Sequence, residues 1–226
     1  MKATHEIIAD FDAIAGALAQ RPARRKLVPA ERALLRHVPP AARSALDVGC
    51  GDGVVARALA RRGLRVRAVD ISPQMIALAR AHTPPDLDVH YSVGDFMTEA
   101  LPAGTFDVVV TLNVVHHVLL SEAVARLVEL TAPGGTLLIQ DVVTRGVLRY
   151  LFANVAGVIQ NRLRLFLKPH SRSRAVAKLY ERHGRGETYL TPAEAEDVYG
   201  RLLPGARIRH HVDWRYSAVW VRPAAS

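Results

Sequence analysis

The sequence predicts an α/β domain built on a mostly parallel sheet, and three observations predict it. Strand-like and helix-like segments alternate between residues 44 and 143. The strand-like segments carry β-branched runs such as residues 108–110, which suit strands buried on both faces of a parallel sheet. Three glycines, Gly49, Gly51 and Gly53, stand between the first strand and the helix after it. This alternation favours right-handed βαβ crossovers.

The length and composition fit one globular domain. The chain has 226 residues, of which 50% are hydrophobic, and this length is hardly enough for two domains. Cys50 is the single cysteine, so no intrachain disulfide can form, which fits a reducing cytoplasm. Asp10 and Asp12 interrupt the first apolar stretch. We therefore expect no signal peptide and a cytoplasmic protein.

The first forty residues predict a helical cap. Apolar side chains recur at helical spacing over residues 4–20, and a basic connector follows at 20–26. A short helix is expected over 30–37, before the prolines at 39 and 40. The first helix can lie over a ligand site or pack on the edge of the sheet, and the sequence leaves both open.

The central segment, residues 44–143, predicts five strands and three helices. Pro73 suits a first helical turn, with Ser72 as the N-cap, and Ser121 is the expected cap of the third helix. The expected strands are 44–49, 65–70, 87–93, 106–112 and 136–143, and the expected helices are 53–62, 73–82 and 121–131.

A basic insert, residues 144–190, follows this core. Ten Lys or Arg and one acid, Glu181, fall between residues 144 and 185, so this stretch alone equals the net charge of +9. Its apolar stripe predicts a helix over 148–166, and a second helical pattern covers 173–182. The longest uncharged run, 150–161, is too short to span a bilayer.

The last region, residues 191–222, predicts a helix and two closing strands. Thr191 and Glu194 have the spacing of a capping box, which begins a helix that ends near residue 199. Alternating residues then indicate strands at 206–210 and 216–221.

The glycine-rich turn predicts a nucleoside cofactor. Glycines there allow positive φ and a close approach of a ligand to the backbone. Asp70 follows about twenty residues later at the expected end of the second strand, which places an acid within reach of a ribose diol. Val54 stands where the dinucleotide-binding motif G-x-G-x-x-G has its third glycine, so the pattern is G-x-G-x-G preceded by Asp47.

This pattern resembles the first motif of class I S-adenosylmethionine (SAM) methyltransferases. The resemblance continues through four further motifs in the family's order, at residues 69–72, 93–96, 106–110 and 130–137. It implies a Rossmann-like sheet of seven strands with an antiparallel last strand, an N-terminal helical cap and a helical insert before the sixth strand. It also implies SAM as cofactor and S-adenosylhomocysteine as product.

The resemblance implies a role for each matched residue. Asp47 and the glycines would hold the methionine end, Asp70 the ribose hydroxyls, and Asp95 with Phe96 the adenine. Leu112 and Asn113 would border the sulfonium. The expected cofactor-binding residues are Asp47, Gly49, Cys50, Gly51, Asp70, Ile71, Met75, Gly94, Asp95, Phe96, Leu112 and Asn113. Cys50 suits this turn as a small side chain better than as a nucleophile.

His116 and His117 are the candidate catalytic residues. They follow the fourth strand, at the edge where open sheets bind ligands, and a histidine near half-charged at neutral pH could deprotonate a hydroxyl. We favour His117 over His116; a packing role is the alternative. His183, Arg185 and Glu187 could face a substrate, but a solvated loop is the better interpretation. We expect no metal site.

The predicted function is SAM-dependent methyl transfer to a small molecule, preferentially on oxygen, in tailoring or secondary metabolism. We interpret the basic insert first as a lid over a lipophilic or anionic substrate. RNA methylation is disfavoured because residues 111–115 lack the Asn/Asp-Pro-Pro-aromatic motif of many base methyltransferases. A membrane-surface helix is a further interpretation of the insert. The whole-protein alternatives are an RNA methyltransferase and a SAM-binding regulatory protein without catalysis.

Overall fold

The computed structural model describes residues 2–20, 26–144, 174–211 and 214–224. The expected connector over 21–25 and the expected helix over 148–166 lie outside these ranges, as does most of the basic insert. Among the described helices, none combines the length and the apolarity needed to cross a membrane.

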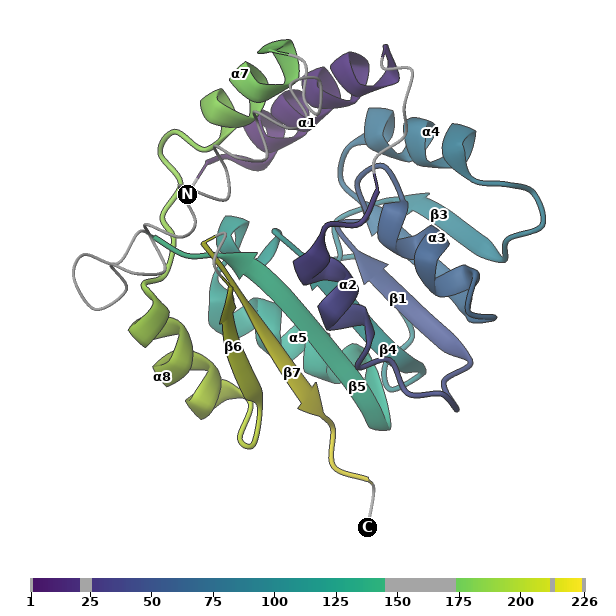
Figure 1. Ribbon diagram of the computed structural model, residues 1–226, viewed down its shortest axis with the longest axis vertical. Helices are drawn as coiled ribbons and strands as arrows, with labels where there is room; N and C mark the ends of the chain where they lie inside the picture. The colour runs from purple at the N-terminus through teal and green to yellow at the C-terminus, as the bar shows by residue number, and fades with distance from the viewer. Residues whose placement is uncertain (1, 21–25, 145–173, 212–213, 225–226) are drawn as a thin grey trace.

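A seven-stranded sheet forms the centre of the molecule, in the order β3-β2-β1-β4-β5-β7-β6 (Figure 1). The first five strands pair in parallel, and β7 is antiparallel to both β5 and β6. This confirms the predicted fold. The strands are β1 (Ser44–Val48), β2 (Arg65–Asp70), β3 (Val89–Val93), β4 (Phe106–Leu112), β5 (Thr131–Val142), β6 (Arg207–His211) and β7 (Arg215–Val221).

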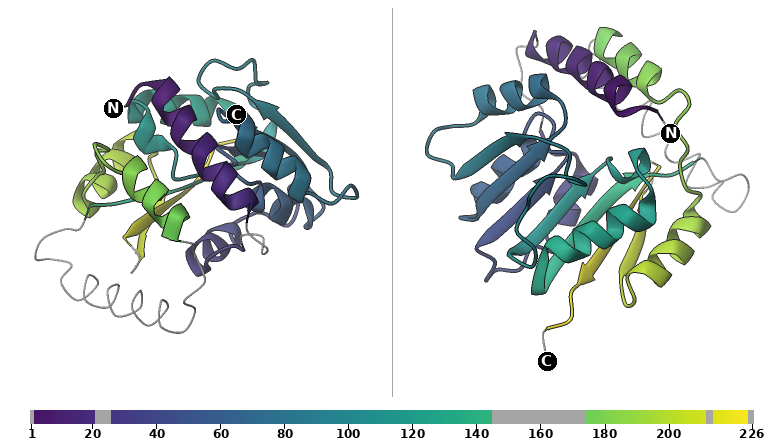
Figure 2. Two further views of the ribbon diagram at one scale, coloured as in Figure 1. Left: turned by 90° about the horizontal axis from the view of Figure 1, so that it is seen from above. Right: turned by 180° about the vertical axis from the view of Figure 1, so that it is seen from behind.

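Helices cover both faces of the sheet. On one face pack α2 (Pro29–Leu35), α3 (Val54–Ala60) and α4 (Pro73–His82), and on the other α5 (Leu120–Leu130) and α8 (Pro192–Leu202) (Figures 1 and 2). Alternate residues of β4 point to the two faces of the sheet. Val108 and Val110 belong to the apolar core under α2, α3 and α4, and Val109 belongs to the core under α5 and α8. The β-branched run is therefore buried on both faces, as expected for a central parallel strand.

Two further helices lie side by side across the carboxyl ends of the strands (Figure 2). These are α1 (Thr4–Ala19) and α7 (Arg174–His183), which we call the helical roof. Ile14 and Ala15 of α1 pack on Met75 of α4, and Leu179 and Tyr180 of α7 join the same apolar cluster. The first helix thus lies over the carboxyl ends of the strands and does not pack on the edge of the sheet.

Local capping confirms two of the three predicted helix starts. Ser72 Oγ accepts from the Met75 N–H at 3.0 Å. Thr191 and Glu194 cap each other's backbone N–H groups, at 3.2 and 2.7 Å. The prediction for Ser121 is wrong: α5 begins at Leu120 without a side-chain cap. A short 3₁₀ turn, η1 (Val115–His117), leads the backbone into the helix earlier than expected.

Candidate functional site

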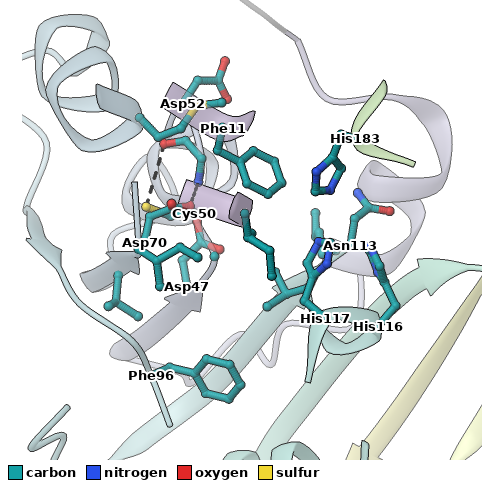
Figure 3. A pocket seen from close by; sticks show the side chains of 18 of the residues that line it. Phe11, Asp47, Cys50, Asp52, Asp70, Phe96, Asn113, His116, His117 and His183 are labelled. Atoms are coloured by element: carbon teal, nitrogen blue, oxygen red, sulfur yellow. Dashed lines mark hydrogen bonds between the residues drawn. The ribbon is translucent and has the colours of Figure 1, made fainter. Parts of the chain in front are cut away.

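A cavity of about 350 Å³ lies between the carboxyl ends of the strands and the helical roof (Figure 3). Asp47 from β1, Asp70 from β2 and Leu112 from β4 line its floor, and Phe11 and Tyr180 line it from the roof. Connections from β1 lead to one half of the sheet and those from β4 to the other. The cavity therefore occupies the topological switch point, where open α/β sheets bind ligands.

The glycine-rich turn combines tight packing with open space. Gly49 has φ 66°, and a Cβ there would lie 2.2 Å from the Val114 side chain. Gly51 has φ 52°, but a Cβ there would meet no protein atom within 4 Å. The first glycine is therefore required by the fold, whereas the second leaves room for a ligand against the backbone.

Asp70 is fixed by two backbone hydrogen bonds. Its Oδ2 accepts from the Gly51 N–H at 2.8 Å and its Oδ1 from the Ser72 N–H at 2.9 Å. Burial raises the pKa of Asp70, and these two hydrogen bonds oppose that rise without cancelling it. Each oxygen keeps a further lone pair, so the carboxylate can still accept from a diol.

Cys50 carries no sign of a reactive thiol. Burial raises its pKa well above the ordinary value, and the carboxylates of Asp47, Asp70 and Asp52 raise it further. The thiol therefore stays protonated, in agreement with its interpretation as a small side chain in a tight turn. Asp52, which lines the cavity and is 6% exposed, is an acid that the sequence interpretation did not include.

Asp95 and Phe96 also line the cavity. Asp95 Oδ1 accepts from the Met97 N–H at 2.9 Å, which holds the carboxyl group at the end of the turn after β3. Phe96 is 5% exposed and lines the cavity while packing into the core beneath it. An acid and an aromatic ring thus stand together in the cavity wall.

Asn113 contributes a polar side chain to the lining of the cavity. Its backbone φ of 57° is unusual for a residue other than glycine. Its buried side-chain Oδ1 has no hydrogen-bond partner among the described residues. Leaving such an acceptor unsatisfied costs about 1–3 kcal/mol. A ligand that donates a hydrogen bond there would remove this cost.

These features fit the SAM that the resemblance implies. A ribose diol matches the fixed Asp70 carboxylate, the open side of Gly51 admits a ligand beside the backbone, and a donor group can satisfy Asn113. The twelve residues expected to bind the cofactor all line this one cavity. Their individual roles stay predictions.

His116 stands at the other end of the same cavity, in η1. Its Nδ1 lies 2.7 Å from Asp141 Oδ1, and its backbone N–H donates to Asp141 Oδ2 at 3.1 Å. Asp141 belongs to β5 and is 1% exposed. The sequence interpretation missed this residue, although an acid just after the apolar run over residues 137–139 was a visible signal.

His117 differs from its expected state. Burial lowers its pKa to about 2, and the charges of His116, His183 and Lys2 act in the same direction. The expectation of a half-charged imidazole is therefore wrong for this residue, which is neutral at pH 7. Its low basicity makes it a weak proton acceptor.

Of the three residues that were expected in a solvated loop, His183, Arg185 and Glu187, only Arg185 is exposed, and it pairs with Glu181 at 3.2 Å. His183 is 6% exposed, and its Nδ1 lies 3.2 Å from Asp10 Oδ2. The Glu187 side chain is 1% exposed and lies 3.5 Å from His117 Nδ1. Long-range packing under the helical roof buries these two residues, which no local pattern indicated.

Comparisons with known proteins agree with the geometry. A family model described as a methyltransferase domain matches residues 46–139. An uncharacterised methyltransferase of Mycobacterium tuberculosis is 38% identical over 193 residues, which cover 82% of this chain and 90% of the relative. A ubiquinone biosynthesis O-methyltransferase of Xanthomonas axonopodis is 38% identical over 103 residues, 43% of this chain and 42% of that protein.

Solved structures show the same fold. The magnesium protoporphyrin IX methyltransferase of Synechocystis, crystallised with bound S-adenosylhomocysteine, superposes with a TM-score of 0.62 at 14% identity. The alignment covers 97% of this chain and the whole of that one, at 100%. At this identity the likeness concerns the architecture alone.

Proposed function

The chain belongs to the class I SAM-dependent methyltransferases, and we propose that it transfers the methyl group to a hydroxyl oxygen of a lipophilic small molecule. The observation that carries this proposal is the buried His116–Asp141 pair, which shares one cavity with the cofactor-binding residues. A proton acceptor at this position is useful for a hydroxyl acceptor, because the hydroxyl loses its proton as it is methylated.

The floor of the cavity is proposed to hold the cofactor. Asp70 accepts from the ribose hydroxyls, Asp47 lies towards the methionine ammonium, and Asn113 Oδ1 accepts from a donor near the sulfonium. SAM supplies an already activated methyl group. The protein's task is therefore to align the acceptor with that group and to exclude water, which the helical roof supports.

The His116–Asp141 pair is proposed to act on the acceptor. Asp141 accepts from Nδ1–H and so leaves the Nε2 lone pair for the substrate proton; this tautomer is assigned from the hydrogen-bond arrangement. As the hydroxyl oxygen bonds to the methyl carbon and the carbon–sulfur bond breaks, the hydroxyl proton passes to Nε2. Asp141 stabilises the imidazolium that forms.

The acceptor class follows from the walls near the histidines. Phe11, Val118, Tyr180 and Tyr189 line the same cavity, so apolar and aromatic surface surrounds the polar pair. Such a site suits a phenol or a hydroxylated lipophile better than a strongly charged molecule. The similarity to a ubiquinone biosynthesis O-methyltransferase supports this choice.

The test is a turnover assay of purified protein with SAM and a panel of catechols, hydroquinones and matched anilines. We expect S-adenosylhomocysteine to form with the hydroxylated compounds, and nuclear magnetic resonance of the product to show an O-methyl group. A product methylated on nitrogen or carbon would contradict the proposal, as would SAM binding without turnover on any hydroxylated acceptor.

A further inference from the structure

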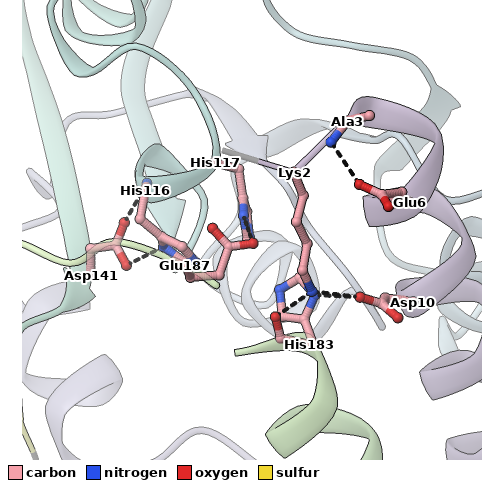
Figure 4. Close-up of polar contacts among 9 residues, drawn as sticks. All are labelled: Lys2, Ala3, Glu6, Asp10, His116, His117, Asp141, His183 and Glu187. Atoms are coloured by element: carbon pink, nitrogen blue, oxygen red, sulfur yellow. Dashed lines mark hydrogen bonds and ion pairs between the residues drawn. The ribbon is translucent and has the colours of Figure 1, made fainter. Parts of the chain in front are cut away.

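Three histidines converge at the acceptor end of the cavity (Figure 4). His116 and His117 come from η1, and His183 ends α7 in the helical roof. Each offers a ring nitrogen, and these nitrogens lie within 4.8 Å of one another. The three side chains are only 8–9% exposed, so water competes weakly for those nitrogens.

The ring nitrogens that face this cluster lack partners. Both nitrogens of His117, and Nε2 of His183, are buried without a hydrogen bond from any described residue. Buried polar atoms of this kind usually have a protein or water partner, and each unsatisfied one costs about 1–3 kcal/mol. Their proximity indicates a common ligand, since one bound ion would accept one nitrogen from His117 and Nε2 from His183.

Each histidine also has a carboxylate beside its Nδ1. The distances are 2.7 Å for His116 and Asp141, 3.2 Å for His183 and Asp10, and 3.5 Å for His117 and Glu187. In metal sites a carboxylate at one ring nitrogen fixes the tautomer and makes the other nitrogen a better ligand. His116 and His183 thus have Nε2 left for a ligand, whereas both nitrogens of His117 are without a hydrogen bond from any described residue.

The charges around the cluster also suit a cation. Three carboxylates, those of Asp10, Asp141 and Glu187, stand next to the histidines. Lys2 opposes them, but its ammonium is engaged by Asp10 at 2.9 Å and by the carbonyl of His183. Arg182, which pairs with Asp10 at 3.1 Å, is 58% exposed and so is screened by solvent. Carboxylates therefore outnumber the cations at the cluster.

We propose that His116, His117 and His183 bind one divalent first-row transition-metal ion, for which Zn²⁺ is the expected species. Three imidazoles with an open fourth position form a known ligand set for Zn²⁺. A tetrahedral ion with Zn–N bonds of about 2.1 Å holds its nitrogens about 3.4 Å apart, so binding draws the rings together by about an ångström.

The proposal deepens the proposed function, because the ion would lie where the acceptor hydroxyl is expected. Ligation would take the Nε2 lone pair of His116, so in the loaded site the ion would lower the pKa of the acceptor hydroxyl, whose proton would pass to solvent water before or during methylation. In the metal-free protein the His116–Asp141 pair acts as the base. The ion would also join the helical roof to the sheet, because His183 belongs to the roof.

The test is metal binding to protein without an affinity tag that has been stripped with a chelator. Zn²⁺ is titrated in competition with a chromophoric chelator, and Co²⁺ is added separately to record its visible spectrum. We expect one ion per chain, a submicromolar Kd for Zn²⁺ and the intense absorption of tetrahedral Co²⁺. His183→Gln and His117→Gln should each weaken binding about 100-fold, and Asp141→Asn by about 10–100-fold.

His90→Gln is the matched control, because His90 is exposed on β3 and should leave metal affinity unchanged. Thermal melts without metal verify that each variant folds. A wild-type Kd weaker than about 10 µM, or equal binding by wild type and both histidine variants, would overturn the proposal. SAM titration of the same samples separates the two proposals: SAM binding without metal binding rejects the metal site alone.

Discussion

Asp141 Oδ1 lies 2.7 Å from Nδ1 of His116, although the first residue belongs to β5 and the second to the turn after β4. The parallel pairing of β4 with β5 brings them together, since both residues lie at the carboxyl ends of these neighbouring strands. The sheet itself therefore positions the proposed base.

Substitution of Asp141 by Asn should lower kcat about 100-fold and leave SAM affinity within twofold. The amide cannot stabilise a charged imidazole, and general base catalysis contributes about 10²–10⁴-fold. Steady-state kinetics with a phenolic acceptor and calorimetry with SAM measure the two quantities on metal-free protein. Asp86→Asn, an exposed change, serves as the control. Equal loss of SAM affinity would mean that Asp141 supports the fold of the cavity instead.

Asp70→Asn should weaken SAM binding about 10–100-fold, because hydrogen bonds to a charged group contribute about 1.5–3 kcal/mol. The pH dependence has a definite sign. Burial raises the pKa of Asp70, and a protonated carboxyl group accepts less well. SAM affinity of the wild type should therefore fall as the pH drops through that raised pKa, whereas the variant should lack this dependence. Calorimetry between pH 4.5 and 8 measures both.

Alanine substitutions at Gly49 and Gly51 should have different effects: the first should impair folding, and the second should impair SAM binding. Gly49→Ala places a Cβ 2.2 Å from Val114, so it should lower the thermal midpoint strongly or prevent folding. Gly51→Ala meets no protein atom and should cost only about 1–2 kcal/mol of backbone strain. Its methyl group should instead obstruct SAM. Thermal melts and SAM titration distinguish them; a stable Gly51→Ala protein with normal SAM affinity would contradict the proposed ligand position.

Tyr199 and Tyr216 share a buried hydrogen bond of 2.9 Å between their hydroxyl groups. Tyr199→Phe should cost about 1–2 kcal/mol, since it leaves the Tyr216 hydroxyl without that partner. Burial raises the pKa of both phenols, so the folded chain keeps these protons longer than the unfolded chain. The contribution of the two protonated phenols to the free energy of unfolding is complete below about pH 10, where the unfolded chain also keeps its protons. It is lost as the pH rises above about 10.

Urea unfolding at pH 8 and pH 11 measures that loss, and absorbance at 295 nm follows the phenolates. Both phenols should ionise together with unfolding. Ionisation of all tyrosines near pH 10 in a protein that stays folded would disagree with the buried pair.

The grouping of the twelve expected cofactor-binding residues in one cavity was predictable, because most of them belong to successive strand ends and turns between residues 47 and 113. Gly51 and Asp95 follow strands and Asp70 ends one, and a parallel sheet brings the carboxyl ends of its strands together. Asp141 and His183 were not predictable as partners of the histidines, because each pairing depends on how distant elements pack. The Ser121 cap failed because α5 begins at Leu120, one residue before Ser121, so the serine lies inside the helix and cannot cap it.

The position of the helical roof divides the cavity by origin. The floor comes from residues between 47 and 113, whereas α1 and α7 supply aromatic walls from two segments that flank that core. Under the proposed function, exchange of these two helices between relatives would change the walls on the acceptor side. It would also remove the hydrogen bond from Ser72 Oγ to Asp12 Oδ1 of α1, which lies beside Asp70. Under the proposed function, relatives that keep the floor would keep the reaction, whereas changes in the helical roof would alter the choice of acceptor.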